Sequence, residues 1–335
     1  MKRKKYLTIR DIAEKSGFSI NTVSRVLNEK DDVNENTKKK IKNIIEETGY
    51  VRNVAASGLR TMQTKIIGVV FYDNSNPFYA EVLKGIEEAA RKFGYQIIFM
   101  NTNQNYEKEA SAIKILQQRR VDGILVNPVQ IENNDLQNLL KNDFPVVVMA
   151  LHFEDLDIDE IYSDEFSGGY LATRHILERN RKKILLISTQ LSKSAPKMLL
   201  NGYKKALNEF NIPFDKKYLY LTNSDMKSGY MAIQKLLQQG VEFDGVFCYN
   251  DLLAVGALRA LKENNLIVPD DVTLVGYDDI DISSYTSPSI STIHVQKFEI
   301  GYYAFIMLME KIQGKTNKAQ KKKLEVKLII RESSS

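Results

Sequence analysis

The chain has 335 residues, of which 43% are hydrophobic, and this length predicts two or three domains with cores of their own. No apolar run approaches the roughly 20 residues that cross a bilayer, and the basic N-terminus passes into charged sequence without a signal-peptide core. The one cysteine, Cys248, excludes an intramolecular disulfide and a cysteine-based zinc site. These features predict a cytoplasmic protein.

Positive charge is concentrated at the start of the chain. Residues 1–65 hold 15 Lys+Arg and 8 Asp+Glu, whereas the remainder holds 32 basic and 34 acidic residues. A basic segment attached to a nearly neutral body is typical of proteins that bind the phosphate backbone of nucleic acid. A merely solvated basic surface is the alternative.

Residues 9–28 have the pattern of a helix-turn-helix. Ala13 is small where two helices would cross, and Gly17 allows the positive φ of a tight turn. Ile12, Val23 and Val26 are spaced to meet between the helices. The second helix would begin after Ser19 and expose hydroxyl, amide and guanidinium groups, which suit the major groove of DNA. An ordinary helical hairpin with a solvated face is the alternative.

A third helix is predicted to start at Asn34 or Asn36 and to stop at Gly49. Residues 51–64 lack a core-forming pattern and are predicted to be a linker with one short helix over 53–59. About seven residues are too few for a stable isolated helix, and Gly58 weakens it further. We therefore expect this helix to form only on DNA.

From residue 65 onward, short apolar runs alternate with amphipathic helical stretches. Such alternation predicts parallel, doubly wound sheets with both faces covered by helices. The runs fall into two series, which predict two α/β lobes with a ligand at the carboxyl ends of their strands, between the lobes. The predicted strands lie near 66–72, 96–100, 123–126, 146–151, 183–188, 218–221, 244–248 and 272–276.

Several motifs, taken together in their order and spacing, resemble the lac-repressor (LacI) family of bacterial transcription regulators. They are Thr-Ile-Arg-Asp-Ile-Ala at 8–13, Ser-Ile-Asn-Thr-Val-Ser-Arg-Val-Leu-Asn at 19–28, Asn-Pro-Phe-Tyr at 76–79, Arg-Val-Asp-Gly-Ile at 120–124, Asn-Asp-Leu-Leu-Ala-Val-Gly-Ala at 250–257, Val-Pro-Asp-Asp-Val at 268–272 and Val-Gly-Tyr-Asp-Asp at 275–279.

This resemblance implies three parts: a helix-turn-helix head over 1–50, a hinge over 51–64 and an effector-binding, dimerising core over 65–335. The core would be like periplasmic sugar-binding proteins, and its chain would cross between the lobes three times. The first lobe would comprise about 65–163 and 294–322, and the second about 164–290 with a final strand near 324–331.

The implied function is that of a repressor whose affinity for a near-palindromic DNA operator is controlled by a small metabolite, with a sugar or sugar derivative favoured. An activator or a solute-binding receptor of the same fold is the alternative. Four-chain members of the family carry leucine heptads beyond the final strand; none follow Arg331, so we expect a homodimer.

The DNA contacts are predicted from side-chain chemistry together with the resemblance. Asn21 can pair with adenine, Arg25 with guanine or phosphate, and Ile20 can cover a thymine methyl. In the family the positions of Ile20 and Asn21 discriminate operators. Leu59, exposed in the linker, is expected to wedge into the minor groove from each chain of a dimer. The full set is Thr8, Ser19, Ile20, Asn21, Thr22, Ser24, Arg25, Asn28, Asn53, Ala56 and Leu59.

The predicted effector site uses polar and aromatic residues that follow strands. Aromatic rings would stack on an apolar ligand face, and Asp278 matches a family position that binds the effector. The arginine and aspartate common in the family are replaced by Leu199 and Ala150, which predicts a less polar pocket. The expected ligand-binding residues are Asp73, Phe78, Tyr79, Lys193, Ser224, Asn250 and Asp278.

An enzyme is a further class of function, and the sequence does not support it. The glycine-rich nucleotide-binding motifs and the Gly-x-Ser-x-Gly nucleophile motif are absent, and the three histidines form no recognisable catalytic or metal-binding set. We expect no cofactor and no metal.

Overall fold

The computed structural model describes residues 7–50, 63–129, 133–316 and 318–335. Their contacts divide the chain into two units, one ending at Thr64 and the other running from Lys65 to Ser335. No helix in the described ranges is long and apolar enough to cross a membrane.

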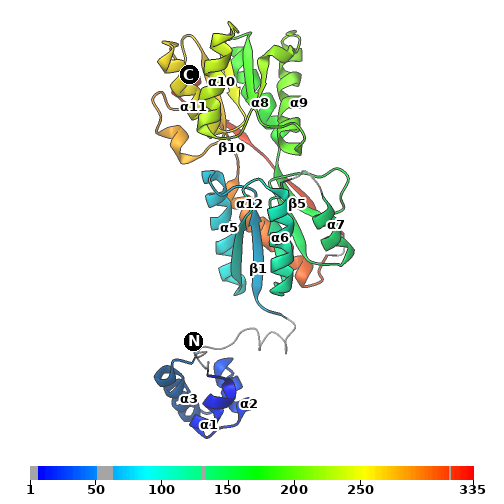
Figure 1. The fold of residues 1–335 in the computed structure, drawn as a ribbon, viewed down its shortest axis with the longest axis vertical. Helices are drawn as coiled ribbons and strands as arrows, with labels where there is room; N and C mark the ends of the chain where they lie inside the picture. Colours follow the sequence, from blue (N-terminus) through cyan, green and yellow to red (C-terminus); the bar gives the residue numbers. More distant parts are fainter. Residues whose placement is uncertain (1–6, 51–62, 130–132, 317) are drawn as a thin grey trace. The chain divides into compact units, whose positions relative to one another are not determined.

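The first unit has a small three-helix core (Figure 1). Thr8 caps the first helix and forms a capping box with Asp11, and Gly17 ends that helix with a φ of 72°. The core is formed by Ile12, Val23, Val26 and Ile41. The three helices are α1 (Ile9–Ser16), α2 (Ile20–Leu27) and α3 (Glu35–Thr48).

The second unit contains two six-stranded sheets, each covered by helices. The sheet of the first lobe has the order β11-β5-β4-β3-β1-β2, and all of its pairings are parallel. Its elements are β1 (Ile66–Phe71), α5 (Pro77–Phe93), β2 (Gln96–Asn101), α6 (Tyr106–Gln118), β3 (Gly123–Val126), α7 (Asn134–Lys141), β4 (Val146–Met149), β5 (Asp159–Ser163), α12 (Lys297–Ile312) and β11 (Lys321–Leu324).

The second lobe repeats this plan with the order β12-β10-β9-β8-β6-β7. Only β12 runs antiparallel to its neighbour. Its elements are α8 (Glu165–Glu178), β6 (Ile184–Ser188), α9 (Ser194–Glu209), β7 (Leu219–Leu221), α10 (Met226–Gln238), β8 (Gly245–Cys248), α11 (Asp251–Glu263), β9 (Thr273–Asp278), β10 (Ser291–His294) and β12 (Lys327–Ile329). The helical head and the two parallel-sheet lobes predicted from the sequence are confirmed.

The chain passes between the lobes after β5, after β10 and after β11. The final strand expected in the second lobe near 324–331 corresponds to β12, which pairs with β10 in the second sheet. Leu324 instead ends β11 and pairs with Ser163 in the first sheet, so the last crossing lies between Leu324 and Lys327.

Helices in the second lobe pack with almost no space at glycine positions. A Cβ atom at Gly256 in α11 would lie 1.9 Å from the carbonyl oxygen of Met226, at the start of α10. Two packed backbone segments cannot move aside as the end of a flexible side chain can. The close packing of α10 and α11 therefore requires a glycine at this position.

We predict that Gly256→Ala destabilises the second unit. Overpacking costs about 1–3 kcal/mol, which exceeds or offsets the roughly 1 kcal/mol that alanine contributes as a helix former. Thermal unfolding of the full chain would measure the loss. Gly123→Ala is the control, because its Cβ would meet only the ends of the Leu308 and Ile312 side chains. Equal melting temperatures for Gly256→Ala and the unmodified chain would contradict this packing argument.

Candidate functional site

The exposed start of α2 is the first candidate site. Ser19 caps the helix, and its hydroxyl accepts a hydrogen bond from the backbone N–H of Thr22 at 3.1 Å. Val23 and Val26 are buried against the other helices, which turns Ile20, Asn21 and Arg25 toward solvent. Ile20 keeps 42% of its surface exposed, a large value for an apolar side chain. Ile20 and Asn21 therefore lie in the exposed first turn of α2, and Arg25 follows on the solvent side of its last turn.

Arg25 already has a partner within the head. Its Nε atom donates to Oδ1 of Asp32 at 3.1 Å, and its guanidinium also pairs with Oδ2. About half of each side chain remains exposed. This pair orients Arg25, but it also places a carboxylate where a DNA phosphate or a guanine edge would compete for the same donors.

We predict that Asp32→Asn strengthens binding to DNA of any sequence. The change removes a negative charge near the phosphate backbone and frees the Arg25 guanidinium, and an exposed pair of this kind is worth at most about 1 kcal/mol. Affinity for random-sequence duplex DNA should rise up to about fivefold, and fluorescence anisotropy would measure it. Asp31→Asn, the neighbouring acid, serves as control. Weaker binding by Asp32→Asn would mean that the pair orients Arg25 for DNA.

Some of the other residues expected to contact DNA form hydrogen bonds within the head. Thr8 donates to Asp11 Oδ2 at 2.7 Å, and the amide of Asn28 donates to the carbonyl oxygen of Ser24 at 2.7 Å, at the end of α2. These side chains cap helices in the DNA-free chain. The expected hinge contacts Asn53, Ala56 and Leu59 lie outside the described residues, as does the predicted 53–59 helix.

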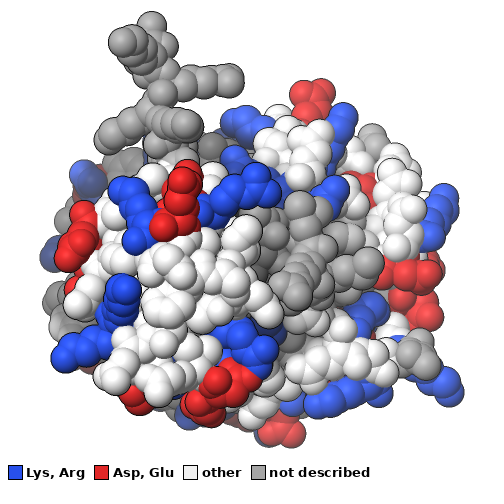
Figure 2. Space-filling view, turned by 90° about the horizontal axis from the view of Figure 1, so that it is seen from below, with Lys and Arg blue, Asp and Glu red and all other residues white. Residues whose placement is uncertain are grey.

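The three helices themselves are not the source of the head's positive charge. Residues 7–50 hold eight basic and eight acidic residues, so the excess within 1–65 comes from residues 2–5 and 52–65. Figure 2 shows both signs of charge interspersed on one face of the molecule. Electrostatic attraction to DNA should therefore come mainly from the segments that flank the helices.

The second candidate site is a cavity lined by residues of both lobes, with about 90 Å³ of room for the centres of water molecules. This is several times the roughly 10–15 Å³ needed to hold one water. All seven expected effector residues line it. The others, which sequence reasoning missed apart from Ala150, are Tyr72, Asn76, Asn127, Pro128, Ala150, Leu151, Ser163, Glu165, Thr189, Ala195, Tyr249, Tyr277 and Val295.

Three acidic side chains in the cavity differ in their surroundings. Burial raises the pKa of Asp278 well above its ordinary value, and burial also raises the pKa of Glu165 to about 8. Burial acts in the same direction on Asp73, but hydrogen bonds from Ser75 and Gln104 outweigh it and lower the pKa. In the described part of the chain neither Glu165 nor Asp278 forms an ion pair; the hydrogen bond from Asn76 to Asp278 and the backbone hydrogen bonds to Glu165 oppose the effect of burial only in part.

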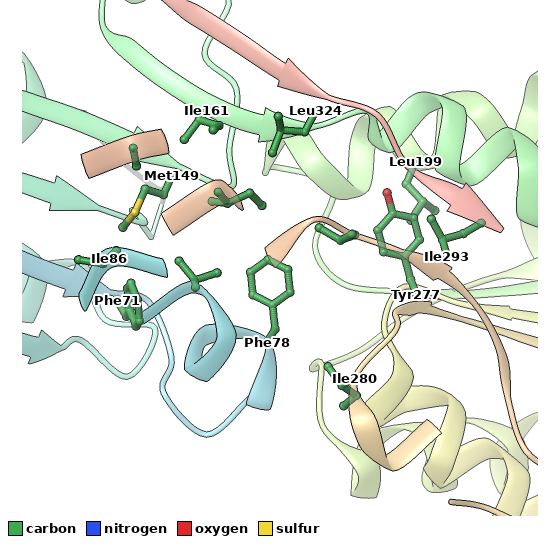
Figure 3. Packing of buried hydrophobic residues seen from close by; sticks show 14 of the residues in the cluster. Phe71, Phe78, Ile86, Met149, Ile161, Leu199, Tyr277, Ile280, Ile293 and Leu324 are labelled. Carbon is green, nitrogen blue, oxygen red and sulfur yellow. The ribbon is translucent and has the colours of Figure 1, made fainter. Parts of the chain in front are cut away.

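Aromatic rings form much of the cavity wall. Phe78 and Tyr79 at the start of α5 meet edge to face, with ring centroids 5.1 Å apart. Tyr72 adds a ring from the first lobe, and Tyr249 and Tyr277 add two from the second. Figure 3 shows Phe78 and Tyr277 within one buried cluster. Flat apolar surfaces of this kind suit a ligand with an apolar face.

Two buried polar atoms of the cavity wall have no hydrogen-bond partner among the described residues. They are Asn127 Oδ1 and the Tyr277 hydroxyl. Asn250, by contrast, uses its whole amide in capping. Its Oδ1 accepts from the N–H of Leu253 at 2.8 Å, and its Nδ2 donates to the carbonyl oxygen of Ser224 at 2.9 Å. Asn127 is thus the amide with spare capacity for a ligand.

Leu199 does not shape the cavity, and the expectation that it does was wrong. Its side chain is fully buried, and it is not among the lining residues. It lies in the interior cluster drawn in Figure 3, where α9 passes so close to α8 that a Cβ at Gly169 would be 2.2 Å from the Leu199 carbonyl oxygen. Ala150 and Leu151 do line the cavity, so part of the wall is aliphatic.

Both units of the chain match known protein families. Residues 8–53 match the bacterial regulatory proteins of the lacI family, and residues 64–332 match the periplasmic binding proteins and sugar binding domain of the LacI family. The chain is 36% identical over 328 residues to the HTH-type transcriptional regulator RegA of Clostridium saccharobutylicum, covering 98% of this chain and 99% of the relative. It is 34% identical to the repressor PurR of Vibrio atlanticus, covering 92% of each.

Solved structures give the same result. The lac repressor dimer bound to operator and the anti-inducer ONPF aligns with a TM-score of 0.88 at 26% identity, covering 98% of this chain and 99% of the repressor chain. The complex of the transcriptional regulator CelR with cellobiose aligns with a TM-score of 0.75 at 27% identity, with the same coverage. From its N-terminal helices to its last strand, the chain belongs to the LacI family of DNA-binding bacterial transcription regulators.

Proposed function

We propose that the protein is a cytoplasmic, homodimeric repressor whose affinity for a near-palindromic operator is set by a small molecule held in the cavity of the second unit. The observation that carries this proposal is the cavity itself: it is built from both lobes and lies on the same chain as a head with exposed Ile20, Asn21 and Arg25. A ligand that contacts both lobes stabilises one arrangement of the lobes over the others. Such a difference in affinity is required if the ligand is to control DNA binding.

The cavity favours an uncharged, hydroxyl-rich ligand such as a sugar. Lys193 is the single cation among the described lining residues and is opposed by Asp73, whose pKa is lowered, so a phosphate or carboxylate would gain no net attraction. Carboxyl oxygens and Asn127 Oδ1 need donors, which hydroxyl groups supply. The cellobiose carried by the related CelR structure agrees with this class of ligand.

Two measurements on the full chain test the proposal. Selection from a randomised duplex pool should enrich a near-palindromic site. Thermal unfolding should then be followed with cellobiose, glucose, ribose, glucose 6-phosphate and hypoxanthine, since a ligand raises the melting temperature according to its concentration and Kd. We expect a neutral sugar to stabilise the chain and to change operator affinity. Failure to enrich any site, or a stabilising ligand without effect on operator binding, would contradict the proposed function.

A further inference from the structure

Three consecutive residues of the second lobe contact the first lobe beside the cavity. The ammonium of Lys193 lies 3.5 Å from the ring centroid of Tyr72, just after β1. The hydroxyl of Ser194 accepts a hydrogen bond from the backbone N–H of His152 at 3.2 Å. Ala195 is 6% exposed and belongs to a hydrophobic cluster of the first lobe. We call residues 193–195 the clasp.

The three contacts of the clasp differ in physical origin, and all of them are made with the first lobe. A cation on a ring face is attracted by the negative charge of the π-system, and the attraction grows as water is excluded. The cluster that receives Ala195 includes Leu151 and Phe153, which flank His152. The N-terminus of α9 is therefore attached to the segment after β4 by one polar and one apolar contact, and to Tyr72 by the ammonium.

Lys193 is well placed for this role and poorly placed for binding a ligand anion. Burial lowers its pKa to about 8, and only Glu109 and Asp73, both of the first lobe, oppose that effect. Its charge is thus stabilised by a ring and two carboxyl groups across the lobe boundary. A ligand anion would have to draw the ammonium away from all three groups.

We propose that Lys193 is a positioning residue: with Ser194 and Ala195 it fastens the second lobe to the first, so that the two walls of the ligand cavity face each other before any ligand binds. This role replaces the direct ligand contact expected for Lys193 from the sequence. It concerns the ligand-free chain, so its test requires neither effector nor operator and is independent of the proposed function.

Hydrogen exchange of the ligand-free full chain tests the clasp. Lys193→Met keeps the aliphatic stem and removes the charge. We expect exchange in residues 150–154, which include the His152 N–H, to become about 2- to 30-fold faster, the range for loss of one cation–π contact. Exchange in β8, inside the second lobe, should stay unchanged. Lys197→Met is the matched control, since Lys197 is exposed one turn further along α9.

Two further variants separate the clasp from a general loss of stability. Lys193→Arg keeps a cation that stacks on rings and should retain the slow exchange of residues 150–154. Tyr72→Leu should accelerate exchange as much as Lys193→Met, and the double variant no more than either, because both remove the same contact. Unchanged exchange in Lys193→Met, equal acceleration in Lys197→Met, or additive effects in the double variant would overturn the proposal.

Discussion

Asn21→Ala should abolish the preference for one base pair at symmetric positions of the operator, while binding to other sequences stays nearly unchanged. Asn21 is exposed in the first turn of α2, where a side-chain amide can donate and accept at once toward an adenine edge. Losing such a bidentate contact costs about 1–3 kcal/mol for each half-site. Anisotropy titrations against the selected operator and a set of single-base variants would measure the change.

Asn36→Ala provides the matched control for this prediction. Asn36 is also an exposed asparagine near the start of a helix, but that helix is α3. It should leave the ranking of operator variants as it is in the unmodified chain. If Asn21→Ala instead weakens binding to every sequence by the same factor, then Asn21 contacts the DNA backbone, and base reading belongs to Ile20 and Arg25.

The sequence was sufficient to predict the architecture because local patterns determine most of it. The capping box at Thr8, the left-handed Gly17 and the alternating strands and helices after residue 65 all act over a few residues. The three crossings between the lobes do not. They rest on pairings such as Leu324 with Ser163, far apart in the chain, and only the family resemblance predicted them.

The cavity was predicted in part for the same reason. Residues at the ends of strands or just after them, such as Asp278 and Asp73, meet at one edge of a sheet by topology, and their polarity is visible in the sequence. Glu165 escaped notice because it follows the cap Asp164 and resembles an ordinary first-turn acid. Leu199 was misassigned because a position three residues before Gly202 indicates nothing about which side of α9 faces the ligand.

Asp278→Ala should abolish the response to the effector and leave operator binding by the free protein nearly normal. Asp278 ends β9 with a φ of 100°, and this strained backbone places a half-buried side chain at the cavity wall. Hydrogen bonds between neutral groups contribute about 0.5–1.5 kcal/mol each, so losing two of them raises the Kd of a sugar about 5- to 150-fold. Titration calorimetry would measure this.

The ligand-free variant should not be less stable near neutral pH. Burial raises the pKa of Asp278 above its ordinary 3.8, so its contribution to folding is present below pH 3.8 and is lost as the pH rises through the folded-state value. Removing the carboxyl removes that loss, whereas Asp281→Ala, at an exposed acid three residues later, should change neither stability nor ligand affinity. A melting temperature well below that of the unmodified chain would show that Asp278 holds the fold rather than the ligand. Full ligand affinity in a stable Asp278→Ala protein would place the effector elsewhere.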